Sequence, residues 1–193
     1  MFRVTGLMLL TVSVSTLTPA LAQGPGTKFG AIIGGATLSD MDNFPAVGDS
    51  RWGGTAGFLV GINAGRTALT LEGTWVQKGG GNTRLDYIEF PLTLGAVATL
   101  GGGTARGRFY SGFSVGFKVS CSTDVLSCDN AEGTEWGLPV GLQLAKVTET
   151  GSFFGVDVRY TFALSDAFEV VQSRNRPWAF RVMIGKQLGT SSR

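Results

Sequence analysis

The chain has 193 residues and no histidine, and this absence limits the chemistry open to it. Histidine titrates near neutral pH, so it is the usual general base of hydrolytic enzymes and the commonest metal ligand. A serine or water nucleophile generally needs such a base nearby. The sequence therefore predicts a protein that is not an enzyme, that uses no cofactor and that has no metal site.

Long apolar runs and clusters of basic residues are also missing. Although 43% of the residues are hydrophobic, no unbroken apolar stretch after residue 22 approaches the ~20 residues that a membrane-spanning helix requires. If the chain crosses a membrane, it must do so with strands. The 16 lysines and arginines are nearly balanced by 14 acidic residues and form no cluster, so nucleic acid is not an expected partner.

The N-terminus has the pattern of a secretory signal peptide. Arg3 precedes an apolar run, and Ala20-Leu21-Ala22 matches the small-residue pattern of a cleavage site. The apolar run is too short for a membrane-spanning helix, although a retained N-terminal anchor is the alternative. We expect residues 1–22 to be a signal peptide and residues 23–193 to form one domain.

Alternation of large apolar residues with glycine or polar residues dominates the rest of the chain. In 109–119 one parity carries Phe109, Phe113 and Phe117, while the other carries glycine and lysine, and 136–144 and 154–162 repeat the pattern. Such a strand has two unlike faces, as a lipid-facing barrel strand does. Eight segments near the ~9–11 residues that a tilted strand needs to cross a bilayer are expected at 28–37, 52–62, 67–78, 84–96, 107–119, 134–146, 152–164 and 176–188.

The predicted fold class is therefore all-β, an eight-stranded antiparallel up-and-down transmembrane β-barrel after a signal peptide. With both chain ends on the inner side, the outer connections are 38–51, 79–83, 120–133 and 165–175, and the inner ones are 63–66, 97–106 and 147–151. The outer connection 79–83 is short for its side, and the inner turn 97–106 is long. Phe44 and Phe168 are the outer-loop aromatics that we expect to be exposed and available for binding.

The two cysteines, Cys121 and Cys128, lie in the polar outer stretch 120–133. Export favours their pairing, and a disulfide across so small a ring would stabilise the protein by roughly 2–3 kcal/mol. A metal site with Asp124 and Asp129 is the alternative, which the lack of histidine disfavours.

Several short motifs occur in a fixed order along the mature chain. They are Leu69-x-x-Glu72-x-x-Trp75-x-x-Lys78-Gly79, Tyr87-Ile88-Glu89-Phe90-Pro91-Leu92, Gly112 and Gly116 ahead of a loop cysteine, Arg159-Tyr160 with Leu164, and Gly185-x-x-Leu188. In these motifs the chain resembles a known family, the eight-stranded bacterial outer-membrane β-barrels of the porin-family, PorT-like barrel domain. The resemblance implies a closed barrel in the bacterial outer membrane, contact with outer-membrane lipid and with the barrel-assembly machinery, and no established activity for most members. Leu188 stands where such barrels usually end in an aromatic residue.

Charged residues of the inward parity are predicted to form a network in the lumen. A basic residue on the lipid face costs about 2–4 kcal/mol at the bilayer midplane, so an inward position is favoured, where charges must pair. The network would plug the pore; a proton- or ligand-responsive site at Glu72, Glu89 and Arg159 is the alternative. The expected members are Glu72, Glu89, Glu135 and Asp157 with Arg108, Lys118, Arg159 and Arg181.

Together these patterns predict a non-enzymatic integral outer-membrane protein with a closed polar lumen. An eight-stranded lumen is just wide enough for its own side chains, so a diffusion pore is disfavoured. Its role would be structural in the cell envelope, or interaction with an extracellular ligand or protein through the outer loops. The alternative is a secreted, soluble, lipocalin-like barrel that binds a small apolar ligand, which the glycine-rich polar parity disfavours.

Overall fold

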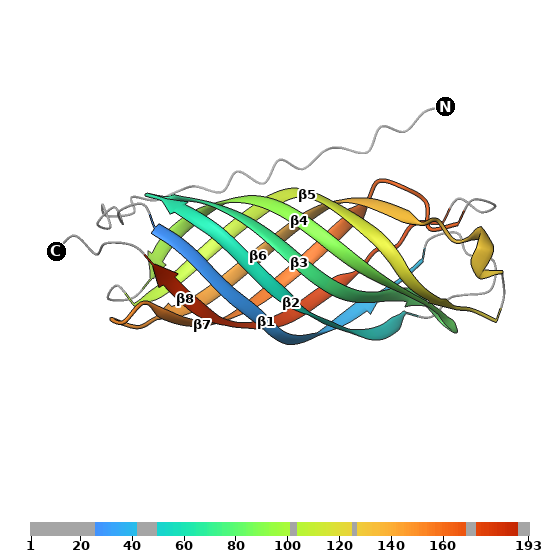
Figure 1. The fold of residues 1–193 in the computed structure, drawn as a ribbon, viewed down its shortest axis with the longest axis horizontal. Helices are drawn as coiled ribbons and strands as arrows, with labels where there is room; N and C mark the ends of the chain where they lie inside the picture. The colour runs from blue at the N-terminus through green and yellow to red at the C-terminus, as the bar shows by residue number, and fades with distance from the viewer. Residues whose placement is uncertain (1–25, 42–49, 101–103, 125–126, 169–172, 189–193) are drawn as a thin grey trace, which may run out of the picture.

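Eight antiparallel strands, each paired with its neighbours in chain order, close into a single barrel (Figure 1). The computed structural model describes residues 26–41, 50–100, 104–124, 127–168 and 173–188. The predicted all-β, eight-stranded, antiparallel up-and-down barrel is confirmed. The strands are β1 (Gly26–Ser39), β2 (Arg51–Ala64), β3 (Thr67–Gly80), β4 (Thr83–Leu100), β5 (Ala105–Ser122), β6 (Thr134–Val147), β7 (Ser152–Ala163) and β8 (Trp178–Leu188).

The two ends of the barrel differ in their connections. At one end, here called the turn end, β2, β4 and β6 connect to the following strands, β1 begins and β8 finishes (Figure 1, left). At the loop end, longer segments join β1 to β2, β5 to β6 and β7 to β8, and the segment between β5 and β6 contains a short 3-10 helix, Cys128–Asn130. Among the described residues, no helix has both the length and the apolar character needed to cross a membrane.

One predicted connection is wrong. The sequence predicts a long inner turn over 97–106, but β4 and β5 stay paired from Val97 opposite Arg108 to Leu100 opposite Ala105. The run of glycines that follows Leu100 favours a turn, yet the apolar residues before it have partners across the ladder. The connection at the turn end is therefore short, as in the other two hairpins there.

Side-chain direction alternates along the strands, but a register shift interrupts the alternation in β1, and a second shift lies between Asp86 and Tyr87, where β4 pairs with β5. Lys28 and Ile32 are buried in the lumen, and a register shift between Ile32 and Gly35 then turns Thr37 and Ser39 inward instead. Such a bulge adds one residue to one strand and reverses the parity beyond it. Simple alternation therefore cannot place both halves of β1.

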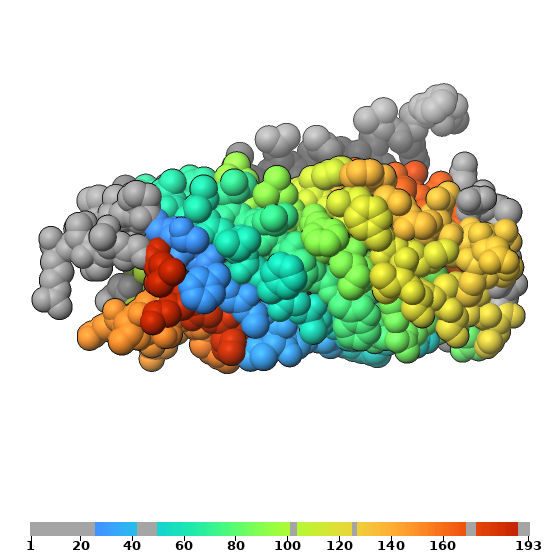
Figure 2. All heavy atoms as spheres, in the orientation of Figure 1, coloured from blue at the N-terminus to red at the C-terminus, as the bar shows by residue number. Residues whose placement is uncertain are grey.

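The outer surface of the barrel is covered by large apolar side chains. Phe58, Leu94 and Phe109 have exposed fractions of 60%, 58% and 61%. Aromatic rings of neighbouring strands stack on this surface, with the ring centroids of Phe113 and Trp136 5.2 Å apart. Figure 2 shows ring side chains from several strands on one face of it. The lumen, in contrast, holds the buried charged residues.

Close approach of β4 and β5 requires glycine at one inward position of β5. A Cβ atom at Gly112 would lie 2.0 Å from the carbonyl oxygen of Leu92 and 2.7 Å from the Cα of Thr93. At Gly107 in the same strand, the nearest atom to such a Cβ is the Leu100 Cδ1 at 3.4 Å, the end of a side chain. Gly112 thus permits the tight strand contact that curves the sheet here.

We therefore expect Gly112→Ala to lower the free energy of unfolding by roughly 1–3 kcal/mol, because the new methyl group collides with backbone that cannot move aside. Gly107→Ala is the matched control and should change stability by less than about 0.5 kcal/mol. Both values can be measured by urea unfolding of the refolded barrel in detergent or lipid vesicles. Equal stability of the two variants would contradict the close approach of β4 and β5.

Candidate functional site

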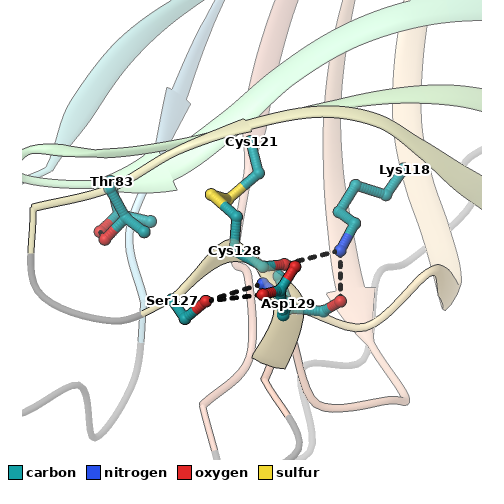
Figure 3. The surroundings of a disulfide bond; sticks show 8 residues. Thr83, Lys118, Cys121, Ser127, Cys128 and Asp129 are labelled. Carbon is teal, nitrogen blue, oxygen red and sulfur yellow. Dashed lines mark hydrogen bonds between the residues drawn. A yellow bond between two sulfur atoms is a disulfide. The ribbon is translucent and has the colours of Figure 1, made fainter.

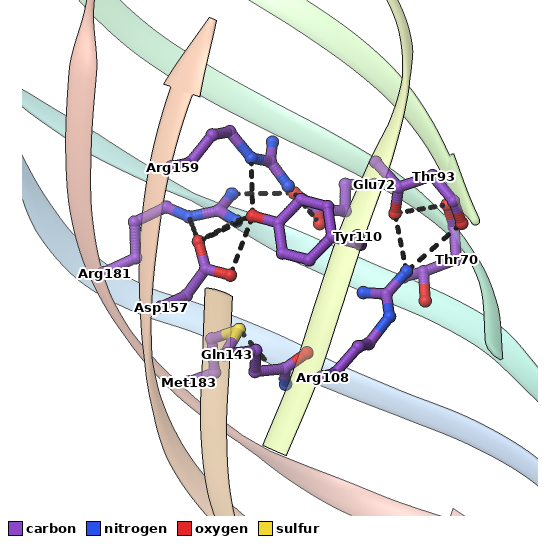
Figure 4. Close-up of polar contacts among 10 residues, drawn as sticks. All are labelled: Thr70, Glu72, Thr93, Arg108, Tyr110, Gln143, Asp157, Arg159, Arg181 and Met183. Carbon is purple, nitrogen blue, oxygen red and sulfur yellow. Dashed lines mark hydrogen bonds and ion pairs between the residues drawn. The ribbon is translucent and has the colours of Figure 1, made fainter. Parts of the chain in front are cut away.

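An ion-pair layer fills the middle of the lumen. The Glu72 carboxylate accepts hydrogen bonds from Arg159 and Arg181, with each oxygen 2.7 Å from one guanidinium nitrogen. Arg181 also pairs with Asp157, whose Oδ1 lies 2.6 Å from its Nη2 (Figure 4). All four side chains are at least 95% buried. Two acids and two bases therefore neutralise one another in this layer.

Tyr110 lies between these ions and is the central member that sequence reasoning missed. Its hydroxyl donates to Asp157, 2.8 Å from Oδ2, and accepts a hydrogen bond of 2.9 Å from the Nε of Arg159. Gly141 provides the space, because a Cβ atom there would lie 2.4 Å from the Tyr110 hydroxyl oxygen. Its position in the sequence could have indicated an inward side chain, because Tyr110 has the same even parity in β5 as the inward Arg108.

A second ion-pair layer lies nearer the loop end. The Lys78 ammonium contacts Glu89 and lies 2.5 Å from the Oε1 of Glu135. The Asn175 side-chain amide donates to the other oxygen of Glu135 at 2.8 Å. Sequence reasoning missed Lys78, although it has the same parity in β3 as Glu72, because it precedes a glycine-rich turn.

Two of the predicted network members have other partners. Arg108 is in the lumen as expected, but its guanidinium donates to the Thr93 hydroxyl at 2.8 Å, and it pairs with no carboxylate of the described residues. The expectation that Lys118 joins the network is wrong. Its ammonium donates to the backbone carbonyl oxygens of Cys128 and Ala131 (Figure 3), because β5 continues past the last lumen layer into the loop region.

The loop segments pack together over the loop end, and we call this assembly the cap. A disulfide joins Cys121 and Cys128, with Cα atoms 5.8 Å apart (Figure 3). Isolated bridges join Met41 to Asn175 and Ala131 to Phe168. The apolar core of the cap consists of Met41, Leu85, Tyr87, Ala131, Ala167 and Phe168.

Phe168 does not present its ring to solvent. Its side chain is 1% exposed in the core of the cap, so the prediction of an exposed binding aromatic at this position is wrong. An isolated bridge pairs Phe168 with Ala131, and both residues belong to the core of the cap. Phe44, the other aromatic named for binding, lies outside the described residues.

Ion pairs and hydrogen-bonded polar groups therefore fill the middle of the lumen and its loop end, and a smaller apolar cluster of Ile32, Leu59, Phe153 and Met183 is buried beside them. Arginine and lysine side chains bind the four predicted carboxylates, Glu72, Glu89, Glu135 and Asp157. No group of three or more histidine, cysteine or acidic residues that could hold a metal ion occurs among the described residues. This arrangement is the reverse of a lipocalin-like barrel, whose interior must be apolar to bind an apolar ligand.

Comparison with known proteins identifies the fold. No protein-family model and no curated protein sequence matches this chain. The structure is similar to that of Ail, the attachment invasion locus protein of Yersinia pestis, with 12% sequence identity and a TM-score of 0.52. The match covers 87% of this chain and 100% of Ail. The chain thus has the fold of Ail, an eight-stranded outer-membrane β-barrel.

A second structure of Ail, in complex with the heparin analogue sucrose octasulfate, has 12% identity and a TM-score of 0.49. That match covers 86% of this chain and 99% of the other. The more specific resemblance to a porin-family, PorT-like barrel domain stays a prediction.

We expect Glu72→Gln to destabilise the barrel by about 3–5 kcal/mol, because the change leaves two buried arginines without their shared carboxylate. The matched control is Asp166→Asn, which removes a carboxylate from the exposed pair with Arg174, where the N–O distance is 3.3 Å. That change should cost at most about 1 kcal/mol. Urea unfolding in detergent measures both, and an equal effect would contradict the central role of Glu72.

Proposed function

We propose that this chain is a non-enzymatic integral protein of the bacterial outer membrane, with a lumen closed by its own side chains and an interaction or envelope-structural role at the cap. The observation that carries the proposal is the reversed polarity of the barrel, apolar outside and charged inside. We further propose that residues 1–22, which lie outside the described residues, are removed as a signal peptide on export.

The apolar outer surface supports insertion into lipid. Monomeric soluble proteins rarely expose contiguous apolar patches larger than a few hundred Å². Here exposed leucine, valine, isoleucine, phenylalanine and tryptophan side chains alternate along all eight strands. Hydrocarbon is the solvent that such a surface favours. The secreted lipocalin-like alternative would leave this whole surface in water.

The two ends support one orientation. In bacterial outer-membrane barrels the periplasmic turns are short and the extracellular loops are long. The turn end, where β1 begins at Gly26 and β8 ends at Leu188, would then face the periplasm. The cap would face the cell exterior. Outer-membrane lipid and the barrel-assembly machinery are the partners implied by this placement.

The ion pairs made by the lumen carboxylates support a protein without catalytic activity. General acid–base chemistry needs a group that is free to exchange a proton with a substrate in a cleft. Here arginines bind Glu72 and Asp157 in the middle of the lumen, and Lys78 binds Glu89 and Glu135. The chain also has no histidine. Turnover would require breaking the contacts that hold the barrel together.

The cap supports an interaction role. Its apolar core, its bridges and the disulfide order the loop segments, so its exposed polar groups are presented on a fixed scaffold. Asp124, Ser127 and Asp129 are exposed on the segment between β5 and β6. We propose that an extracellular ligand or protein binds this face.

Membrane insertion is tested with a charge on the outer surface. Val158→Arg should reduce barrel stability in lipid vesicles by about 2–4 kcal/mol, because Val158 faces outward in the middle of β7. Asn82→Arg, at the exposed turn after β3, adds the same charge outside the hydrocarbon layer and should have little effect. Boiled and unboiled samples on a detergent gel report the folded fraction. Tolerance of Val158→Arg in lipid would overturn the membrane assignment.

Orientation is tested by labelling intact cells. With the native disulfide left oxidised, a thiol introduced by Asp124→Cys should react with a membrane-impermeant reagent, because the cap faces outward. Glu149→Cys, at the exposed turn between β6 and β7, should react only after the cells are opened. The opposite pattern of labelling would reverse the proposed orientation.

A further inference from the structure

A pocket occupies the lumen at the turn end, below the middle ion-pair layer. It is open to solvent, and the empty space in it, including solvent at its mouth, amounts to about 460 Å³. Its lining residues are positions near the strand ends, such as Lys28 in β1, Arg106 in β5 and Gln187 in β8. The pocket therefore opens along the barrel axis and not onto the lipid-facing surface.

The pocket carries an excess of positive charge. Lys28, Arg106 and Arg108 line it, and no carboxylate of the described residues does. Glu72 and Asp157 are the acids that act electrostatically on Lys28, and arginines of the middle layer already bind both. Arg106 and Arg108 repel the Lys28 ammonium. The three basic side chains thus converge without a carboxylate partner of their own.

Several donors in this pocket have no acceptor. Lys28 is 8% exposed, and its ammonium makes no hydrogen bond or ion pair with any described residue. The Nε atoms of Arg106 and Arg108 are buried without a hydrogen-bond partner. Arg106 uses Nη1 to donate to Gln187 Oε1 at 2.6 Å, and Arg108 uses Nη2 to donate to Thr93. Buried donors without an acceptor are costly, and an anion in the pocket would supply the missing acceptor.

We infer that this pocket binds a small, soluble phosphate monoester with an apolar substituent. Guanidinium groups match phosphate oxygens in geometry, and a dianion balances the charges of Arg106 and Arg108, which a single carboxylate does not. The apolar part of the wall, formed by Val97, Ala145, Val147 and Phe153, would contact the substituent. The pocket itself does not depend on the membrane assignment, but access from the periplasm rests on the proposed function.

Binding is tested by calorimetric titration of phenyl phosphate into the refolded barrel in a neutral detergent without phosphate buffer. Phenyl phosphate should bind at least tenfold more tightly than inorganic phosphate, and phenol should not bind. Arg106→Gln and Lys28→Met should each weaken binding at least tenfold. The matched control is Arg66→Gln, which removes an exposed charge at the neighbouring turn and should leave the affinity within about twofold.

Several results would overturn the inference. One is that phenyl phosphate does not bind at millimolar concentration. Another is that Arg66→Gln lowers the affinity as much as Arg106→Gln does. A third is that Arg106→Gln leaves the affinity unchanged. Competition by phosphatidic acid in the micelles would assign the pocket to a lipid headgroup and overturn the soluble ligand. If Arg106→Gln fails to refold, Arg106→Lys must keep measurable binding. Because the titration is done in detergent, its failure is distinct from failure of membrane insertion.

Discussion

The narrow lumen of an eight-stranded barrel is the constraint on which this structure depends. A charged side chain that points into it loses water and must find its partner on another strand. Glu72 on β3 has two such partners, Arg159 on β7 and Arg181 on β8. Its carboxylate thereby links strands that do not neighbour one another in the sheet. Ion pairing across the lumen then holds the barrel wall together from inside.

Small residues make this filling possible. Tyr110 reaches the middle layer because Gly141 leaves room beside its hydroxyl, and β5 lies close to β4 because Gly112 has no side chain. Alternation of large and small inward residues is a usual way to fill a small barrel. The glycine-rich inward parity is thus the complement of the long arginine, lysine and tyrosine side chains that fill the space.

Charge is distributed unevenly along the barrel axis. The layer near the cap holds two acids and one base, the middle layer is balanced, and the pocket at the turn end is lined by three bases. The cap covers one end with an apolar core and a disulfide, whereas the turn end is left open at a cationic pocket. The two ends therefore differ in chemistry, and the partners proposed for them differ, a macromolecule or ligand at the cap and a small anion at the turn end.

The sequence by itself determined the number of strands and the direction of most of their side chains. A strand repeats every two residues, so parity alone placed Glu72, Glu89, Glu135, Asp157, Arg108, Arg159 and Arg181 inside. Only the tertiary structure decided which of them pair, because barrel closure joins Glu72 to Arg181, 109 residues away. Only the tertiary structure also shows that the Phe168 ring is buried in the cap, that Lys118 donates to backbone carbonyl oxygens, and that β1 contains a bulge. These depend on loop folding and strand register, which have no period in the sequence.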